Sequence, residues 1–213
     1  MENIITKVEV QKNNKNRVNV YVDDEYAFSC DTELVYKYDL KKQRIINLEE
    51  LKEIIAEDNY MKAKNAALKY IERTYKTEKE MKDKLINKGY DEATIKRVII
   101  FLKEYNFLDD RKYAELYIKT KQKNAGKNKI KIDLLKKGVS HSVIESVTEN
   151  LTSDSEEESA RVLAEKKHKT IIKRERDKRK VYEKLIRFLV SKGFTWELSK
   201  SVINKLMNYS IED

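Results

Sequence analysis

The N-terminal part of the chain shows the alternation of apolar and polar side chains that is typical of β-strands. Apolar or β-branched residues occupy every second position over residues 4–10 and again over residues 18–22, which is the period of a strand with one buried face. The segment 12–16 and the pair Asp23-Asp24 supply turn-forming residues between these runs. We therefore expect a small antiparallel β-meander of three strands.

Two helices are expected to follow the meander. Asp31 can cap a short helix that runs to Tyr38, and this helix can cover a sheet that would be marginally stable alone. Asn47 and Glu50 have the spacing of a capping box. From there no helix breaker occurs before about Tyr75. The pattern predicts a helix of about 28 residues, roughly 42 Å long, that connects the meander to the rest of the chain.

Three glycines reveal an internal repeat. Gly89, Gly138 and Gly193 each follow a lysine and precede a hydrophobic residue and then Asp, Ser or Thr. When the sequence is aligned on these glycines, four further positions are apolar in every copy. These positions are Met81, Ile130 and Leu185; Leu85, Leu134 and Leu189; Val98, Val147 and Val202; and Leu102, Leu151 and Leu206.

Each copy of this pattern predicts a helix, a glycine turn and a second helix. The apolar positions before each glycine lie one turn apart on one helix face, as do those after it. A glycine in the left-handed conformation ends the first helix, and Asp, Ser or Thr caps the second. A further helix precedes each copy, at about 61–75, 110–123 and 155–172, so three helices recur with a period of about 50 residues.

The predicted fold class is mainly α: three tandem three-helix repeats in an elongated array, preceded by a small antiparallel β-meander and a short helix. The expected segments are 1–46 for the meander and its helix, 47–106 for the long helix and repeat one, 107–151 for repeat two and 152–213 for repeat three. We expect Trp196 to lie in the core of repeat three. The ten residues 171–180 are extra relative to the other copies and are expected to lengthen two helices or to form a charged elbow.

Composition agrees with this picture. Charged residues make up 39% of the chain and hydrophobic residues 40%, which suits small helical units with thin cores. The chain has no proline and four glycines. It shows no signal-peptide pattern and no run of about 20 apolar residues that could span a bilayer. With Cys30 as its single cysteine, we expect a soluble protein of the reducing cytoplasm.

Charge is distributed unevenly along the chain. The net charge is +9, yet residues 1–118 hold 23 basic and 23 acidic side chains. Residues 119–137 contain eight lysines and one aspartate, and residues 166–192 contain twelve basic and three acidic side chains. Two separate basic blocks favour a polyanionic partner. The candidate binding residues are Lys119, Lys121, Lys123, Lys127, Lys129, Lys131, Lys136 and Lys137 in the first block, and Lys166, Lys169, Lys173, Arg174, Arg176, Arg179 and Arg187 in the second.

A simpler interpretation stays open for both blocks, which is a solvated charged helix face. It is stronger for the second block, where Glu175, Asp177 and Glu183 can pair with neighbouring cations. Neither block is rich in aromatic residues, so base stacking is weakly supported. We expect contact with the phosphate backbone that depends on salt and not on base sequence.

The sequence offers no set of residues for catalysis. His141 and His168 are isolated, and with one cysteine they cannot assemble a zinc site. No nucleotide-binding or metalloprotease motif occurs. The pair Asp109-Asp110 precedes a helix and is interpreted as a cap. We expect a protein that is not an enzyme and needs no cofactor or metal.

One stretch, residues 77–118, resembles the signature of the RecX family of bacterial recombination regulators. The residues that carry the resemblance are Glu80-Met81, Lys84-Leu85, Lys88-Gly89-Tyr90, Phe107-Leu108-Asp109-Asp110 and Tyr113-Ala114. The meander and long helix resemble the N-terminal extension of Firmicutes members. Methionine stands at 81 where the family usually has leucine, and lysines replace arginines in the run that enters repeat two. Lysine acts as a point charge and does not clamp phosphate in a bidentate manner.

The resemblance implies a monomer that lies along the helical groove of the RecA filament on single-stranded DNA. It implies suppression of the filament's ATPase, strand-exchange and co-protease activities, hence a role in recombination, DNA repair and the SOS response. The partners would be RecA and the phosphate backbone of single-stranded DNA, with double-stranded DNA as a second option and no membrane. The alternative is a general DNA-binding or nucleoid-type protein that acts without RecA.

Overall fold

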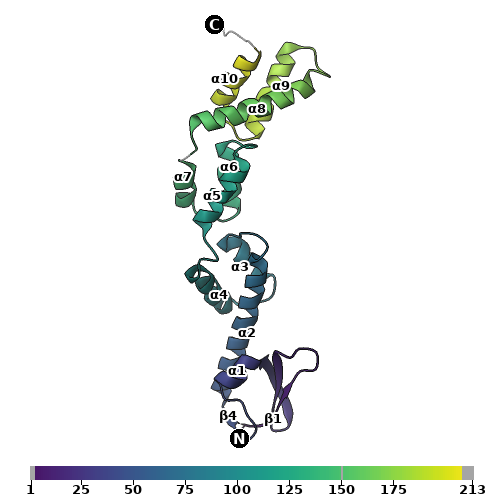
Figure 1. Cartoon of the computed structure of the whole chain (residues 1–213), viewed down its shortest axis with the longest axis vertical. Coiled ribbons are helices and arrows are strands. Elements are labelled where there is room, and N and C mark those ends of the chain that lie inside the picture. Colours follow the sequence, from purple (N-terminus) through teal and green to yellow (C-terminus); the bar gives the residue numbers. More distant parts are fainter. Residues whose placement is uncertain (1–2, 150, 208–213) are drawn as a thin grey trace. The chain divides into compact units, whose positions relative to one another are not determined.

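The computed structural model describes residues 3–149 and 151–207, so the ends of the predicted segments at 1–2, 150 and 208–213 lie outside the described residues. The chain forms two compact units. The first unit comprises the described residues up to Tyr75 together with Met81–Phe107, and the second comprises Lys76–Glu80 together with the described residues from Leu108 onward. Figure 1 labels the elements along the chain.

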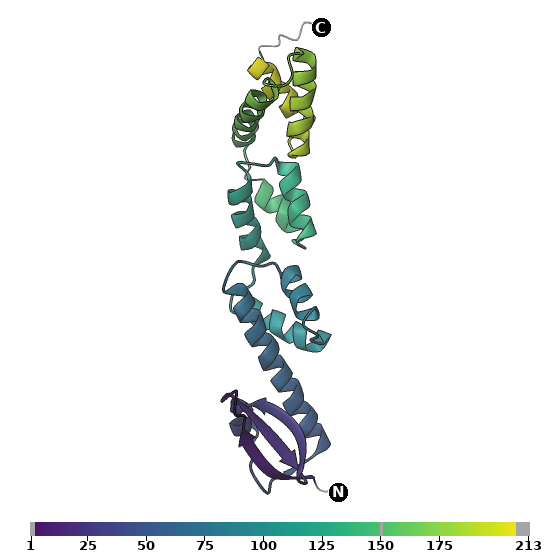
Figure 2. The same ribbon diagram turned by 90° about the vertical axis from the view of Figure 1, so that its right-hand side faces the viewer.

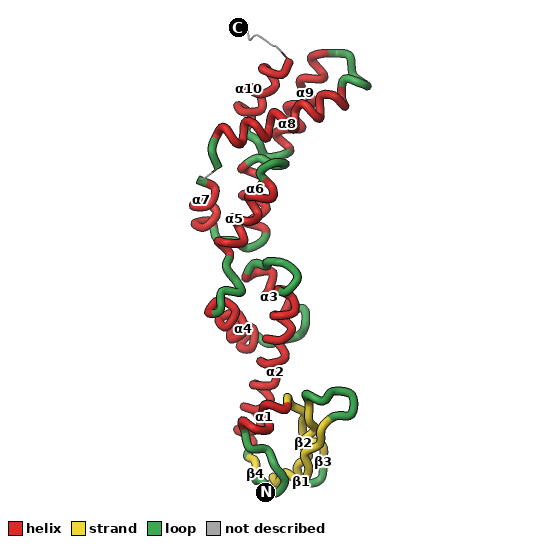
Figure 3. The backbone as a smooth tube through the Cα atoms, in the orientation of Figure 1, coloured by secondary structure: helices red, strands yellow, loops and turns green. Residues whose placement is uncertain are grey.

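The first unit begins with an antiparallel sheet. Its meander strands are β1 (Asn3–Val10), β2 (Arg17–Val22) and β3 (Glu25–Asp31), as the alternation predicted. The sheet has a fourth strand that the sequence analysis missed, β4 (Ile45–Ile46), which pairs with β1 and gives the order β3-β2-β1-β4. Figure 3 shows these strands in yellow. A strand of two residues is too short to produce a periodic signal.

The alternation in β1 is interrupted by a shift of register between Ile5 and Lys7. Ile5 is fully buried, whereas Ile4 is 39% exposed. A bulge moves one side chain of a strand to the other face, so the period that starts at Ile4 does not mark the buried face at this end of the strand. The buried residues of the sheet form one core with Leu34 and Ile54 from the adjoining helices.

Two helices follow the sheet in the first unit, α1 (Thr32–Lys37) and α2 (Leu48–Ile71). The predicted caps are confirmed: the Asp31 side chain accepts from the backbone N–H of Glu33, and the Asn47 side chain accepts from that of Glu50. Figure 2 shows that α2 extends from the sheet to the helices of repeat one. It ends at Ile71, four residues earlier than expected.

A buried ion network joins the sheet to α2. Asp58 on α2 is 3% exposed, and its carboxylate accepts hydrogen bonds from the Arg17 guanidinium at 3.0 and 3.1 Å and from the backbone N–H of Asp31 at 3.0 Å. Lys62 completes the network at 2.6 Å. Burial alone would raise the pKa of Asp58, but the hydrogen bonds from Arg17 and Lys62 outweigh it and hold this pKa below its ordinary value.

Repeat one continues with α3 (Glu78–Ile86) and α4 (Glu92–Glu104). Gly89 separates them with φ +83°, and Asp91 caps α4. The apolar positions that the glycine alignment picked out are buried here, namely Met81, Leu85, Val98 and Leu102. The described part of repeat one therefore has the helix, glycine turn and helix that the pattern predicted.

The second unit contains repeats two and three. Repeat two is formed by α5 (Asp110–Lys121), α6 (Lys127–Lys136) and α7 (His141–Thr148), and repeat three by α8 (Ser153–Ile171), α9 (Lys178–Ser191) and α10 (Trp196–Met207). Each has its own hydrophobic core. Gly138 and Gly193 have φ values of +85° and +90° and end α6 and α9 as expected.

Three details of repeat three differ from expectation or decide between options. Trp196 is 54% exposed and not a core residue, because Phe194, two positions earlier, fills the core at 2% exposure. Thr152, which the sequence analysis did not single out, caps α8. The extra residues mainly lengthen two helices, since α8 has 19 residues against 12 in α5 and α9 has 14 against 10 in α6, and residues 172–177 form the elbow between them.

The glycine turns of repeats two and three are also points of close packing. A Cβ atom added at Gly138 would lie within 3.0 Å of the Lys79 side chain, and one added at Gly193 would lie within 3.0 Å of the backbone of Lys129. Real Cβ atoms do not approach neighbours this closely. In the described part of the chain, a Cβ atom at Gly89 would meet no heavy atom within 4 Å.

Alanine substitutions at the three glycines should therefore differ in cost. Gly89→Ala should lower the free energy of unfolding by about 1–2 kcal/mol, because alanine is strained at positive φ. Gly138→Ala and Gly193→Ala should cost roughly 1–3 kcal/mol more through overpacking. Urea unfolding followed by circular dichroism measures all three, and Trp196 fluorescence reports on the second unit. Equal costs at the three positions would contradict the packing difference.

The Asp58 network should make the first unit sensitive to acid. Because the folded pKa of Asp58 is lowered, its stabilisation is fully present above the unfolded pKa of about 4 and is lost as pH falls through the folded pKa. Asp58→Asn should lower the free energy of unfolding by roughly 3 kcal/mol at pH 7. It should also flatten the loss of stability below pH 4, measured by urea midpoints across pH. A parallel acid limb in both proteins would contradict this role.

Candidate nucleic-acid interface

All residues of the two predicted basic blocks lie in the second unit. The first block begins in the last turn of α5, where Lys119 and Lys121 are exposed beside the C-terminal carbonyls. Cations there interact favourably with the helix dipole. Lys123 is exposed in the connection that follows, and Lys127 is the first residue of α6.

The start of α6 is held against repeat three. The backbone N–H of Gly126 donates to the carbonyl of Lys192 at 2.9 Å, and that of Asn128 donates to the carbonyl of Gly193 at 3.3 Å. The backbone N–H of Lys127 donates to the Glu156 carboxylate on α8 at 2.8 Å. Backbone groups that a helix start leaves unpaired are thus satisfied by the next repeat, and this fixes where the cations around Gly126 lie.

Two lysines of the first block have structural partners. Lys131 donates to both oxygens of Glu145 at 2.7 and 2.6 Å, and Lys137 donates to Glu80 at 2.6 Å. The hydrogen bond to Glu80 raises the pKa of Lys137. These side chains hold the helices together, so our proposal for a partner rests on the others.

The remaining lysines of the first block are available to solvent. Lys119, Lys121, Lys123, Lys129 and Lys136 are exposed and Lys127 is half-buried, and none of the six forms an ion pair with another described residue. Lys136 lies at the opposite end of α6 from Lys127, about 15 Å away along the helix axis. We call Lys119, Lys121, Lys123 and Lys127 the junction surface, because they surround the contact between repeats two and three.

The second block surrounds the elbow between α8 and α9. Its acidic residues have defined partners: Asp177 caps α9, and Glu175 accepts from Lys184 at 2.8 Å. Glu183 lies 3.5 Å from Arg179 and 3.9 Å from Arg187. For these two arginines the simpler interpretation therefore holds: they form part of a solvated helix face on which acidic and basic side chains pair. The ion pairs are exposed and therefore weak.

The other candidate residues of the second block form no ion pair with a described residue. Lys166 and Lys169 lie in the C-terminal part of α8, and Lys173, Arg174 and Arg176 lie in the elbow. All five are exposed, and within residues 3–149 and 151–207 none has an acidic partner. We call these five residues the elbow surface. Its two arginines offer the planar fork that suits phosphate.

The junction surface and the elbow surface are separate. Helix α9 has 14 residues and spans about 21 Å. It begins at the elbow and ends at the Gly193 turn against which α6 packs, and Figures 1 and 2 both show the elbow at the end of α9 that lies away from α6. The second unit thus presents two clusters of cations at opposite ends of one helix, which suits a long polyanion more than a single small ligand.

No metal site accompanies these surfaces in the described ranges, where no group of three potential metal-ligating side chains occurs. His141 is exposed and lies 3.9 Å from Glu145. Among the same residues, no helix combines the length and the apolar character that crossing a bilayer would need.

One cluster of cations was missed by the sequence analysis. Lys62 and Lys69 on α2 and Lys84 and Lys88 at the end of α3 line a single hollow in the first unit. Residues 1–118 have no net charge, so composition concealed the cluster. The signal that could have found it is spacing: Lys62 and Lys69 lie seven residues apart on one side of α2, and Lys88 follows Lys84 by four residues, in the turn after α3.

Comparison with protein families gives matches along most of the chain. Residues 3–47 match the model of the regulatory protein RecX N-terminal domain. Residues 63–102, 109–147 and 154–203 match the models of the first, second and third three-helix domains of RecX. The three three-helix domains agree in number and order with the three repeats that the glycines predicted.

Individual proteins give the same result. The chain is 52% identical over 204 residues to a regulatory protein RecX of Clostridium perfringens, with 96% of each chain covered. It is 53% identical over 205 residues to one of Clostridium tetani, with 96% of this chain and 95% of the relative covered. A crystal structure of regulatory protein RecX matches with a TM-score of 0.75 at 26% identity, covering 97% of this chain and 100% of the other. RecX from Lactobacillus salivarius matches with a TM-score of 0.64 at 29% identity, covering 71% and 99%.

The junction surface should contribute to the salt dependence of DNA binding. Neutralising three of its lysines, as K119Q/K121Q/K123Q, should weaken binding to labelled oligo(dT) and reduce the slope of log affinity against log salt by about 2, since each phosphate contact contributes about 0.7. Fluorescence anisotropy over a salt series measures this slope.

Two control variants isolate the effect. K42Q/K52Q/K96Q removes the same charge from exposed positions of the first unit and should leave the slope unchanged. K131Q removes the partner of Glu145 and should lower the melting temperature with little change of slope. An unchanged slope for the junction variant would assign these lysines to solubility.

Proposed function

Since the chain belongs to the RecX family of regulatory proteins, we propose that it binds the filament that RecA forms on single-stranded DNA and inhibits the filament's ATPase, strand-exchange and co-protease activities. The observation that carries the proposal is the pair of cation clusters in the second unit, whose exposed lysines and arginines have no acidic partners among the described residues. Such groups attract phosphate and gain little from the fold itself.

The proposed mode of action is preferential binding to one state of the filament. A protein that binds two states of its partner unequally shifts the partner toward the state that it binds better. A helical repeat protein that contacts several points of the filament would oppose the conformational turnover that ATP hydrolysis requires. We place the junction and elbow surfaces on the DNA phosphates or on acidic surface along the groove.

The packing of the second unit supports such a role. The contact between repeats two and three is made by backbone hydrogen bonds and by a glycine turn with no room for a side chain. Contacts of this kind hold two cation clusters at a fixed separation. A fixed separation reduces the entropy that is lost on binding a regular partner.

A second candidate is a general DNA-binding protein that acts without RecA. The observation in its favour is that both cation clusters are made of side chains suited to phosphate and carry no pattern for reading base edges. Such a protein would inhibit any enzyme that works on the same DNA. It would need to coat that DNA in order to do so.

The two candidates predict different dose responses. Added to RecA on single-stranded DNA, the protein should inhibit ATP hydrolysis at concentrations well below those that cover the DNA. A control reaction with an unrelated enzyme that depends on single-stranded DNA should be unaffected at the same concentrations. A coupled ATPase assay measures both. Equal inhibition of the two enzymes, at full coverage of the DNA only, would support the general DNA-binding protein and contradict our proposal.

A further inference from the structure

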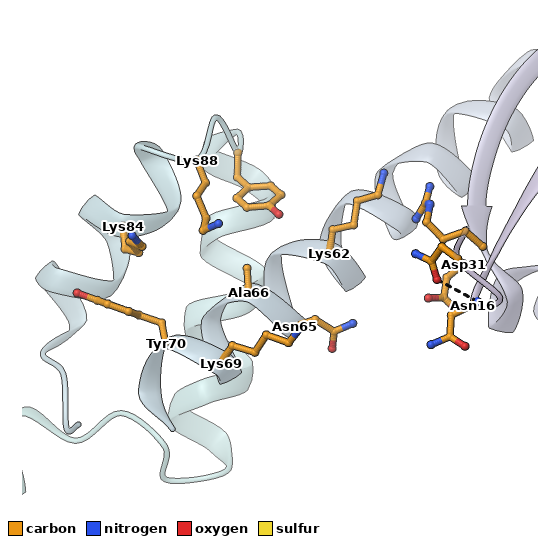
Figure 4. Close-up of a pocket in the computed structure, with 12 residues that line it drawn as sticks. Asn16, Asp31, Lys62, Asn65, Ala66, Lys69, Tyr70, Lys84 and Lys88 are labelled. Atoms are coloured by element: carbon orange, nitrogen blue, oxygen red, sulfur yellow. Dashed lines mark hydrogen bonds between the residues drawn. The ribbon is translucent and has the colours of Figure 1, made fainter. Parts of the chain in front are cut away.

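The first unit, although neutral in total, contains a basic hollow of about 640 Å³ between α2, the turn after α3 and the loop before β2. Figure 4 shows the side chains that line it. Its cations are Lys62, Lys69, Lys84, Lys88 and Arg17, and among the described residues that line it Asp31 is the single acid. Asparagines at 14, 16 and 65, tyrosines at 70 and 90, and Ala66 complete the lining.

The secondary structure explains why these residues share one hollow. Lys62, Asn65, Ala66 and Lys69 follow the spacing of one helix face and extend over about 10 Å of α2. Lys84 and Lys88 lie one turn apart at the end of α3. Both sets line the same hollow. The acidic residues that balance the total charge of the first unit lie mostly outside this hollow, so they do not neutralise its lysines.

Not every cation of the hollow is available to a ligand. Arg17 and Lys62 are engaged by Asp58, and the one acid, Asp31, uses its carboxylate to cap α1. Lys69 and Lys88 are exposed, and Lys84 is exposed with its amine 5.4 Å from the ring centroid of Tyr70. Three lysines therefore remain without an acidic partner among the described residues.

The glycine turn beside the hollow is open, in contrast to its two counterparts. The equivalent turn of repeat two is covered by Lys79, and the hydroxyl of Thr77 donates to the carbonyl of Lys137 there. The turn of repeat three is covered by the start of α6. At Gly89 no described heavy atom would come within 4 Å of an added Cβ atom, so Lys88 and Tyr90 on either side of it line a space that a ligand can enter.

We propose that this hollow is a third nucleic-acid contact, which binds phosphate groups of single-stranded DNA through Lys69, Lys84 and Lys88. The inference rests on the proposed nucleic-acid partner and extends it to the unit that its net charge had excluded. The accessible cations are all lysines, which serve as point charges for phosphate, and the asparagine side chains add uncharged donors. Tyr90 offers a ring face on which a base of a single strand can stack.

An acidic polypeptide fits the hollow less well. Carboxylates gain most from the bidentate fork of arginine, and the one arginine of the described lining is already occupied by Asp58. An acidic segment would also leave the Tyr90 ring without a planar group to stack on. The observations therefore favour a nucleic acid, and the acidic polypeptide becomes an outcome of the test.

The test compares K69Q/K84Q/K88Q with the unaltered full chain in binding to labelled oligo(dT) without RecA. We expect the slope of log affinity against log salt to decrease by about 2, because three phosphate contacts are lost. The matched control K42Q/K52Q/K96Q changes the same charge at exposed positions of the same unit that do not line the hollow, and it should keep the original slope. Circular dichroism melts should show that both variants fold.

The outcomes separate this inference from the proposed function. Because RecA is absent from the assay, a failure to inhibit RecA leaves the result unaffected. An unchanged slope in K69Q/K84Q/K88Q would overturn the inference, whether or not the full chain inhibits the filament. A second titration uses labelled polyglutamate. Loss of polyglutamate binding in this variant, with DNA binding intact, would assign the hollow to an acidic protein and would also overturn the proposal.

Discussion

The second unit depends on the close approach of one repeat to the glycine turn of the next. At Gly193 the backbone of Lys129 occupies the place that a Cβ atom would need, and Gly126 donates its N–H to the carbonyl before that turn. At Gly138 the side chain of Lys79 takes the same place. The glycine ends a helix through its positive φ and also admits the neighbouring repeat. Glycine thus both ends a helix of each repeat and allows the close contact between neighbouring repeats.

The contacts between repeats also determine which lysines are available to a partner. Helix starts are rich in unpaired N–H groups, and at the start of α6 they are satisfied by carbonyl and carboxylate groups of repeat three. Lysines near the joints divide accordingly into those that pair with Glu80 or Glu145 and those that remain exposed. Our proposal assigns the phosphate contacts to the exposed ones, because their charges contribute nothing to the fold through ion pairs with described residues. At Gly89, where no described atom covers the turn, a basic hollow opens instead.

Local patterns predicted the elements well and their limits less well. The meander, the caps at Asp31, Asn47 and Asp91, and all three glycine turns are confirmed, because each depends on a few neighbouring residues. β4 and the bulge in β1 were missed, since both arise from pairing between distant segments. The prediction that Trp196 lies in the core was wrong, because Phe194 occupies that place. Residue type could not decide which of two nearby aromatic rings faces inward.

The sequence by itself determined the repeat, its helices and the family to which the chain belongs, because these follow from periodicity and from short motifs. It also located the charge excess in the second half of the chain. Only the tertiary structure decided which cations are available, since pairs such as Lys137 with Glu80 join residues far apart in the sequence. It also gathered Lys69, Lys84 and Lys88 from two elements into one hollow within a neutral segment. Net charge is a sum over residues, whereas a binding site depends on which of them meet in space.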